Sequence, residues 1–262
     1  MKVYSYSLQG KRQTNEDHHI TLLNIDNKDE TIFPINFFGV FDGHGGGVVS
    51  KYLKSNLPNF FIPKLKKNIY KKDSTFTNYV SEVYNHVQNN LKNDHPRAVE
   101  YCGSTACIGI LSDANILWMI NVGDSRGVLC NKNGEAVQLT IDHKPNLVEE
   151  KKRIEQLGGK IQYDGSDWRI KSLSVSRSFG DLDCCPYVTH EPNIYKYKIN
   201  PKDKFIIIGC DGLWDALSNQ QSIEYIRDLQ FKNYEGNYAK KIANYAIEKG
   251  SMDNVSVIIY FF

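Results

Sequence analysis

Short apolar runs that end in acidic turns are the feature that most restricts how this chain can fold. Runs of this length, bounded by turn residues, favour β-strands over helices. They lie at residues 37–41, 106–111, 116–122, 205–208 and 255–261. Asp42-Gly43, Gly123-Asp124 and Asp211-Gly212 follow three of the runs, and Asp253-Asn254 precedes the last. Acidic residues therefore gather at the ends of predicted strands, which is where we expect the functional site.

Between the predicted strands, apolar residues recur at steps of three and four, which predicts amphipathic helices. These helices cover residues 76–91, 223–229 and 238 to near Gly250. A further helix is predicted over residues 149–157, and Gly158-Gly159 ends it. The strands are grouped together, without the strict strand-helix alternation of a doubly wound parallel sheet. The pattern therefore predicts an α+β fold in which helices cover antiparallel sheets.

The composition excludes several classes of protein. A length of 262 residues is ordinary for one domain, and a net charge of +2 gives no overall field toward nucleic acid or an anionic membrane. No uninterrupted apolar stretch reaches the ~18 residues of a membrane span. The six cysteines form no C-x-x-C pair and the N-terminus has no apolar signal, so we expect a reducing, intracellular compartment.

Carboxylates at the predicted strand ends form the main candidate site. Any one of them alone is better explained as a solvated turn or a helix cap, but several together require a cation to offset their repulsion. Oxygen ligands without clustered His or Cys favour Mg²⁺ or Mn²⁺ over zinc. The candidate ligands are Glu16, Asp17, Asp42, Asp124, Asp211 and Asp253.

Two such cations, about 3.5–4 Å apart, can activate one water for in-line attack on phosphorus. We expect Asp42 to bridge them. Arg12 is the candidate for holding the phosphate because its planar fork donates paired hydrogen bonds, although an arginine in a polar loop is usually only solvated. His44 follows the Asp42-Gly43 turn and is the candidate general acid for a departing alkoxide, although a histidine in a turn is more often structural.

Eight ordered segments resemble the metal-dependent type 2C (PPM) family of serine/threonine protein phosphatases, from Gly10 to the C-terminus. They are Gly10-Lys11-Arg12-Gln13-Thr14-Asn15-Glu16-Asp17, Asp42-Gly43-His44-Gly45-Gly46, Gly103-Ser104-Thr105-Ala106, Gly123-Asp124-Ser125-Arg126, Asp142-His143-Lys144-Pro145, Ser176-Arg177-Ser178-Phe179-Gly180-Asp181, Cys210-Asp211-Gly212-Leu213-Trp214-Asp215 and Asp253-Asn254-Val255-Ser256.

The resemblance implies a four-layer α-β-β-α sandwich, with two central antiparallel β-sheets flanked by antiparallel helix pairs and the metals at one end. It implies a single catalytic domain over residues 1–262, without a regulatory extension, and a variable flap within about residues 142–181. The implied activity is hydrolysis of phosphoserine and phosphothreonine in proteins with two Mg²⁺ or Mn²⁺ ions.

The resemblance also implies ligand sets. Asp42, Asp211 and Asp253 would hold one metal, and Glu16, Asp42 and the Gly43 carbonyl the other, with Asp17 acting through bound water. Asp124 and Asp215, with Asp211, resemble the ligands of a weaker third metal in some members. Thr105 and Asn254 are expected to contact the ligand residues and hold them in position, without binding the metal themselves.

The chain departs from the family pattern in and near the flap. Lys171-Ser172 stands where Asn-Gly is more common, so we expect a differently shaped turn there. Asn15 replaces a frequent Met, and Val48-Val49 replaces small residues. Trp168 is expected in the core of the flap, with a substrate contact as the alternative.

Two other readings compete with the phosphatase. A catalytically weak relative could serve as a binding module, but the residues proposed for catalysis are present. A nuclease or a phosphoesterase for a non-protein substrate could also use paired metals, but no basic and aromatic stripe supports nucleic acid. We therefore expect phosphoprotein substrates, no nucleic-acid or membrane partner, a monomer, and a cytoplasmic location with the nucleus as the alternative.

Overall fold

The most apolar segments of the chain form central strands with both faces covered. In β3 (Asn36–Phe41), Phe37 packs toward the helices of one outer layer and Phe38 packs between two sheets. Successive side chains of a strand point to opposite faces. A strand covered on both faces is therefore a continuous apolar run, which is why these segments stand out in the sequence. The computed structural model describes residues 2–25, 35–112 and 115–262.

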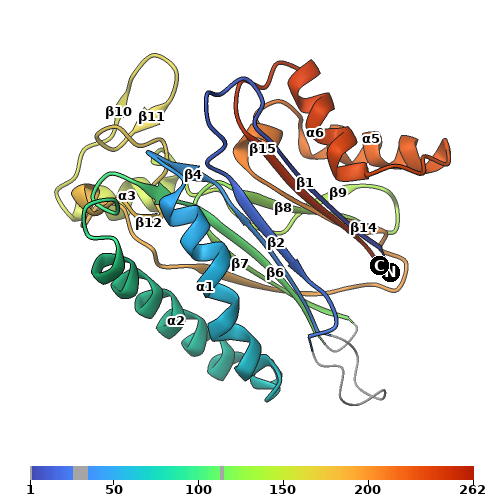
Figure 1. Cartoon of the computed structure of the whole chain (residues 1–262), viewed down its shortest axis with the longest axis horizontal. Coiled ribbons are helices and arrows are strands. Elements are labelled where there is room, and N and C mark those ends of the chain that lie inside the picture. Colours follow the sequence, from blue (N-terminus) through green and yellow to red (C-terminus); the bar gives the residue numbers. More distant parts are fainter. Residues whose placement is uncertain (1, 26–34, 113–114) are drawn as a thin grey trace.

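Two five-stranded antiparallel sheets pack face to face (Figure 1). The first has the order β13-β7-β6-β3-β2 and the second the order β1-β15-β14-β8-β9. The first contains β2 (His18–Leu22), β3, β6 (Ala106–Ser112), β7 (Ile116–Val122) and β13 (Asn193–Lys198). The second contains β1 (Lys2–Leu8), β8 (Arg126–Cys130), β9 (Ala136–Gln138), β14 (Phe205–Gly209) and β15 (Val255–Phe261). Strands β1 and β15 pair along their whole length, so the two ends of the chain lie side by side.

Helix pairs cover the outer face of each sheet, which confirms the predicted α-β-β-α sandwich (Figure 1). Helices α1 (Val48–Leu65) and α2 (Asp73–Asp94) cover the first sheet, and α5 (Asn219–Phe231) and α6 (Tyr238–Glu248) cover the second. Shorter helices are η1 (Ile69–Lys71), α3 (Val148–Gln156), η2 (Leu182–Cys184) and α4 (Asp211–Trp214). No helix among the described residues combines the length and hydrophobicity that crossing a membrane requires.

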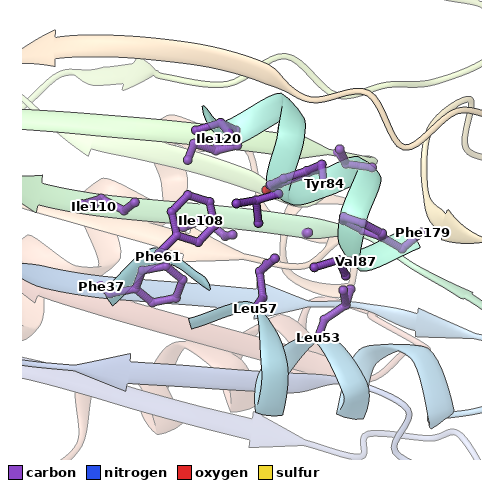
Figure 2. Packing of buried hydrophobic residues seen from close by; sticks show 14 of the residues in the cluster. Phe37, Leu53, Leu57, Phe61, Tyr84, Val87, Ile108, Ile110, Ile120 and Phe179 are labelled. Atoms are coloured by element: carbon purple, nitrogen blue, oxygen red, sulfur yellow. The ribbon is translucent and has the colours of Figure 1, made fainter. Parts of the chain in front are cut away.

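Figure 2 shows the apolar layer between the first helix pair and its sheet. Leu57 of α1, Val87 of α2 and Ile108 of β6 belong to this one apolar cluster, and all three residues are fully buried. Burying a large aliphatic side chain stabilises the fold by roughly 1.5–3 kcal/mol. These contacts hold the helix pair in place and keep the first sheet rigid beneath the turns at its end.

A small three-stranded sheet and a hairpin lie at one end of the sandwich (Figure 1). The small sheet has the order β12-β5-β4 and joins β4 (Gly43–His44), β5 (Gly103–Ser104) and β12 (Phe179–Gly180). The hairpin consists of β10 (Gln162–Tyr163) and β11 (Trp168–Arg169). The three strands of the small sheet come from distant parts of the sequence, and they meet at the same end of the sandwich as the hairpin.

The expectation that Trp168 lies in the core of the flap is wrong. Its side chain is 37% exposed, and its ring packs only against that of Tyr163, with centroids 5.5 Å apart, among the ring contacts of the described residues. The hairpin projects beyond the sheets, and Trp168 is not part of the small apolar cluster that Ile154, Ile170, Cys184 and Val188 form in this region. In the next turn, Ile170 and Leu173 exchange two backbone hydrogen bonds, and Lys171 adopts the left-handed conformation with φ +52°.

We predict that Phe38→Ala destabilises the protein much more than Phe231→Ala. Phe38 is fully buried between the sheets, with its ring 5.0 Å from that of Tyr260, whereas Phe231 is 87% exposed at the end of α5. Removing a buried phenyl ring costs about 3–5 kcal/mol of unfolding free energy, and an exposed one costs about 0.5 kcal/mol or less. Urea unfolding of both variants measures this, and equal losses would contradict the packing described.

Candidate metal centre

Carboxylates from the ends of strands in both sheets meet in one place. Asp42 follows β3, Asp124 lies two residues beyond β7, and Asp211 begins α4 after β14. One carboxylate oxygen from each of these three residues lies within 4.8 Å of the others. Asp17 and Cys210 form a second group of this kind with Asp42. Asp42 therefore belongs to both groups.

Burial and mutual repulsion raise the pKa of the Asp42 and Asp211 carboxyl groups. Burial is the largest cause for Asp42 and Asp211, and the neighbouring carboxylates add to it. Burial likewise raises the pKa of Asp17 to about 6, against hydrogen bonds with Ser256 and Cys210 that lower it. Asp17 Oδ2 is buried and has no hydrogen-bond partner among the residues that the structure describes. A cation at this place would relieve both the repulsion and the unpaired oxygen.

The donor set fits a hard divalent cation. Apart from Cys210, the groups offer only carboxylate oxygens, which Mg²⁺ and Mn²⁺ prefer. Burial raises the pKa of the Cys210 thiol well above its usual value, so the thiolate that would attract a softer metal is disfavoured. Its Sγ accepts a hydrogen bond from Ser256 N–H at 3.1 Å. The residues present therefore suit the metals that the sequence predicts.

Thr105 fixes the backbone of Asp42 from both sides. The Asp42 N–H donates to Thr105 Oγ1 at 3.0 Å, and the Thr105 N–H donates to the Asp42 carbonyl at 2.9 Å. The Thr105 hydroxyl is in turn 2.7 Å from that of Ser125, and both residues are buried. The carboxylate shared by both groups therefore stands on a rigid support.

Asn254, the residue just before β15, bonds to the N-terminal loop. Its Oδ1 accepts from the Glu16 N–H at 2.9 Å, and its Nδ2 donates to the carbonyls of Gln9 and Thr14 at 2.7 and 2.8 Å. Glu16 Oε2 also accepts from the Gly46 N–H at 2.8 Å. Glu16 is thereby brought beside the turn that follows Asp42, although it belongs to neither close group.

The Gly43 position admits no side chain. A Cβ atom there would lie 2.4 Å from the carbonyl oxygen of Glu16 and 2.6 Å from Ser50 Oγ. Glycine is therefore required where the Asp42 turn passes the Glu16 backbone.

Asp124 and Asp215 have different surroundings. Lys144 Nζ forms an ion pair with Asp124 Oδ2, and burial would lower the pKa of Lys144, but the carboxylates around it raise that pKa. Asp215 is exposed and does not line the cleft described next; it lines a neighbouring cavity of about 260 Å³. Asp253 lines both cavities. The structure thus brings Asp124 into the main group and places Asp215 beside it.

An open cleft of about 590 Å³ lies over the carboxylates. Asp42, Asp124, Asp211 and Asp253 are among its lining residues, and the flap contributes Arg169 and residues 172–175. Arg12 and His44 also line it. Most of the candidate residues predicted from the sequence therefore face one space, with Asp17 buried behind them.

The Arg12 guanidinium lies at the rim. Its Nη2 is 2.6 Å from Asp253 Oδ2, and its side chain is 60% exposed. His44 Nε2 is 2.7 Å from Asp181 Oδ2. Burial alone would lower the pKa of His44, but the hydrogen bond and charge of Asp181 outweigh it and the pKa is raised.

Three residues at the site had no role in the sequence interpretation. Lys144, Arg169 and Asp181 contact the carboxylates, the cleft and His44 respectively. Lys144 and Asp181 stand in segments that carry the family resemblance, which was the available signal. Nothing local marks Arg169, because its position depends on how the flap folds.

Comparison with known proteins gives consistent results. Residues 1–255 match the family model described as Protein phosphatase 2C. Protein phosphatase 1L of Bos taurus is 35% identical over 98% of this chain and 71% of its own length, and Probable protein phosphatase 2C 59 of Arabidopsis thaliana is 36% identical over 99% and 79%.

Solved structures show the same fold. A C. elegans sex determining protein superposes with a TM-score of 0.86 at 26% identity, covering 99% of this chain and 64% of that one. Serine-threonine phosphatase 2C from Toxoplasma gondii superposes with a TM-score of 0.83 at 21% identity, covering 99% and 94%. This chain belongs to the protein phosphatase 2C family.

Proposed function

We propose that the chain hydrolyses phosphoserine and phosphothreonine in proteins and requires Mg²⁺ or Mn²⁺ to do so. The observation that supports the proposal is the cluster of partly buried carboxylates around Asp42, which lies beneath a cleft lined also by Arg12 and His44. The relatives are named as protein phosphatases, which supports the same reaction. The polar cleft is open enough to admit a phosphorylated side chain on a protein surface.

When bound, two divalent cations would supply a nucleophilic water and offset the charge of the phosphate. Asp42 would contact both of them, since it belongs to both close groups. Asp211 and Asp253 would complete one site, and Glu16 with the Gly43 carbonyl the other. Asp17 would act from behind through water, and Asp124 with Asp215 would hold a weaker third ion.

Arg12 would hold the phosphate oxygens that face away from the carboxylates. Its planar fork can donate two parallel hydrogen bonds to phosphate, and its exposed side chain needs only to turn from Asp253 toward the cleft. The pairing with Asp253 keeps the guanidinium at the rim until a substrate arrives. Arg12 would thereby orient the phosphate in the cleft.

His44 would donate a proton to the departing serine or threonine oxygen. An alkoxide is a poor leaving group, so a positioned acid contributes on the order of 10²–10⁴-fold to the rate. His44 lines the cleft beside Asp42, and its Nε2 lies 2.7 Å from Asp181 Oδ2, a contact that favours the protonated ring. The mechanism therefore assigns separate residues to binding the phosphate and protonating the leaving group.

We expect hydrolysis of a phosphothreonine peptide to stop in excess chelator and to return with Mn²⁺ or Mg²⁺. The physical reason is that clustered carboxylates repel a phosphate and do not activate a water, whereas divalent cations held by them would do both. Initial rates with and without added metal measure this. Full activity with all divalent cations chelated would refute the proposed requirement.

Asp42→Asn should lower turnover by on the order of 100-fold or more, because the bound cations lower the activation barrier by several kcal/mol. In chelator, its melting temperature should equal or exceed that of the unmutated chain, since a repelling buried charge is removed. The rise in melting temperature on adding Mn²⁺ should be lost.

Asp228→Asn is the control, because Asp228 forms an exposed ion pair with Lys232 on α5. It should keep both the turnover and the rise with Mn²⁺. Normal turnover in Asp42→Asn, or an unchanged rise with Mn²⁺, would remove Asp42 from the proposed site.

His44→Ala should slow alkyl phosphates much more than aryl phosphates. A phosphothreonine peptide needs a proton on its leaving oxygen and should lose about 100-fold or more, whereas p-nitrophenol departs without one. The ratio of kcat for the two substrates measures this, and His86→Ala on the exposed side of α2 is the control. Equal slowing of both substrates would argue against His44 as the acid.

A further inference from the structure

The small sheet holds a histidine and an aspartate on either side of one glycine. In this sheet, His44 of β4 and Gly180 of β12 pair with Gly103 of β5 from opposite edges. A Cβ atom on Gly103 would lie 2.0 Å from Asp181 Oδ2 and 2.4 Å from His44 Nε2. The space above Gly103 is therefore filled by the contact between these two side chains, and only glycine permits it.

Asp181 is held more firmly than an ordinary turn residue. Its side chain is 1% exposed, and its backbone N–H donates to the Cys102 carbonyl at 3.1 Å. It adopts the left-handed conformation with φ +49°, which Asp tolerates better than most residues. Its Oδ2 accepts a hydrogen bond from the Ser178 hydroxyl as well as the contact from His44. The carboxylate thus presents one fixed oxygen to the imidazole ring.

The His44 ring bridges this buried carboxylate and the cleft. Nε2 lies 2.7 Å from Asp181 Oδ2, while 28% of the side chain remains exposed. Among the described residues, Nδ1 has no hydrogen-bond partner, and His44 lines the cleft beside Asp42. Nδ1 is therefore the ring nitrogen that remains available to a substrate.

We propose that Asp181 is a positioning residue for His44: it fixes the ring and keeps an N–H on Nε2, so that Nδ1 carries the proton for the leaving group. The inference rests on the proposed function, because it assigns the support for the proposed acid. Asp181 itself touches neither substrate nor cation. A buried carboxylate that orients an imidazole and stabilises its charged form is a general device of acid-base catalysis.

The proton moves from His44 to the leaving group as the phosphorus–oxygen bond breaks. As oxygen from water forms its bond to phosphorus, the bond from phosphorus to the serine or threonine oxygen breaks, and its electron pair stays on that oxygen. The oxygen takes the proton from His44 Nδ1. The imidazolium becomes a neutral imidazole whose Nε2–H still donates to Asp181, which remains ionised. A proton from solvent then restores the acidic form.

Asp181→Asn tests the inference on the full chain with two substrates, a phosphothreonine peptide and p-nitrophenyl phosphate. An amide cannot stabilise the charged ring, and misplaced catalytic groups lose up to about 100-fold. We expect kcat for the peptide to fall at least about tenfold with KM little changed, while kcat for the aryl ester stays within about twofold. The ratio of the two rates does not depend on the folded fraction, so partial loss of fold does not affect it.

Two further measurements separate positioning from a purely structural role. In a His44→Ala background, Asp181→Asn should cause no further change in the peptide rate, because the group it orients is gone. In nitrogen NMR spectra of the metal-free protein, His44 should carry its proton on Nε2, and Asp181→Asn should abolish that preference. Asp183→Asn, on the same turn but paired with Lys171, is the matched control and should behave as the unmutated chain.

The outcomes distinguish the inference from the proposed function. Equal slowing of both substrates by Asp181→Asn, or no slowing of either, would overturn the positioning role. A further fall in the His44→Ala background would overturn it as well. If His44→Ala itself fails to discriminate between the two substrates, the proposed acid falls first, and the role of Asp181 falls with it.

Discussion

Repulsion between buried carboxylates is the constraint on which the site depends. Asp42, Asp124 and Asp211 come from ends of strands in both sheets, yet their oxygens approach within 4.8 Å. Burial and mutual repulsion raise the pKa of Asp42 and Asp211, so the ionised group is costly without a counter-charge. Packing in the three apolar layers of the sandwich offsets the free energy of this repulsion and holds the strand ends together. A pair of divalent cations would turn this repulsion into a means of binding phosphate.

Closure of the fold and assembly of the site are the same event. The N-terminal strand pairs with the C-terminal strand, and Asn254 then bonds the loop that carries Glu16. Thr105 clamps the backbone of Asp42 from the neighbouring strand. His44 and Asp181, which are 137 residues apart, meet only through the small sheet. Each of these functional groups therefore depends on contacts between segments that are distant in the sequence.

The sequence was most informative where burial is complete. Strands β7 and β15 were predicted at their observed limits, because both faces are covered and all but one residue of each run is apolar. Strand β1 was missed because its half-buried residues alternate with serine and lysine. Helix α1 was missed because it contains Pro58 and Pro63, which weaken a helical pattern. Trp168 was misplaced because nothing in its neighbourhood shows that the hairpin projects into solvent.

The site residues that could be predicted from the sequence are those in turns at the ends of apolar strands. The acidic turns pointed to the carboxylates, since a turn beside an apolar strand is visible in the sequence. The partners of Asp124 and His44 were not visible, because Lys144 and Asp181 lie on loops whose paths are set by packing elsewhere.

The most direct test of the proposed metal centre is an anomalous difference map from crystals grown with Mn²⁺. The account predicts two peaks, both in contact with the Asp42 carboxylate, whereas a cleft with no peak at Asp42 would contradict it.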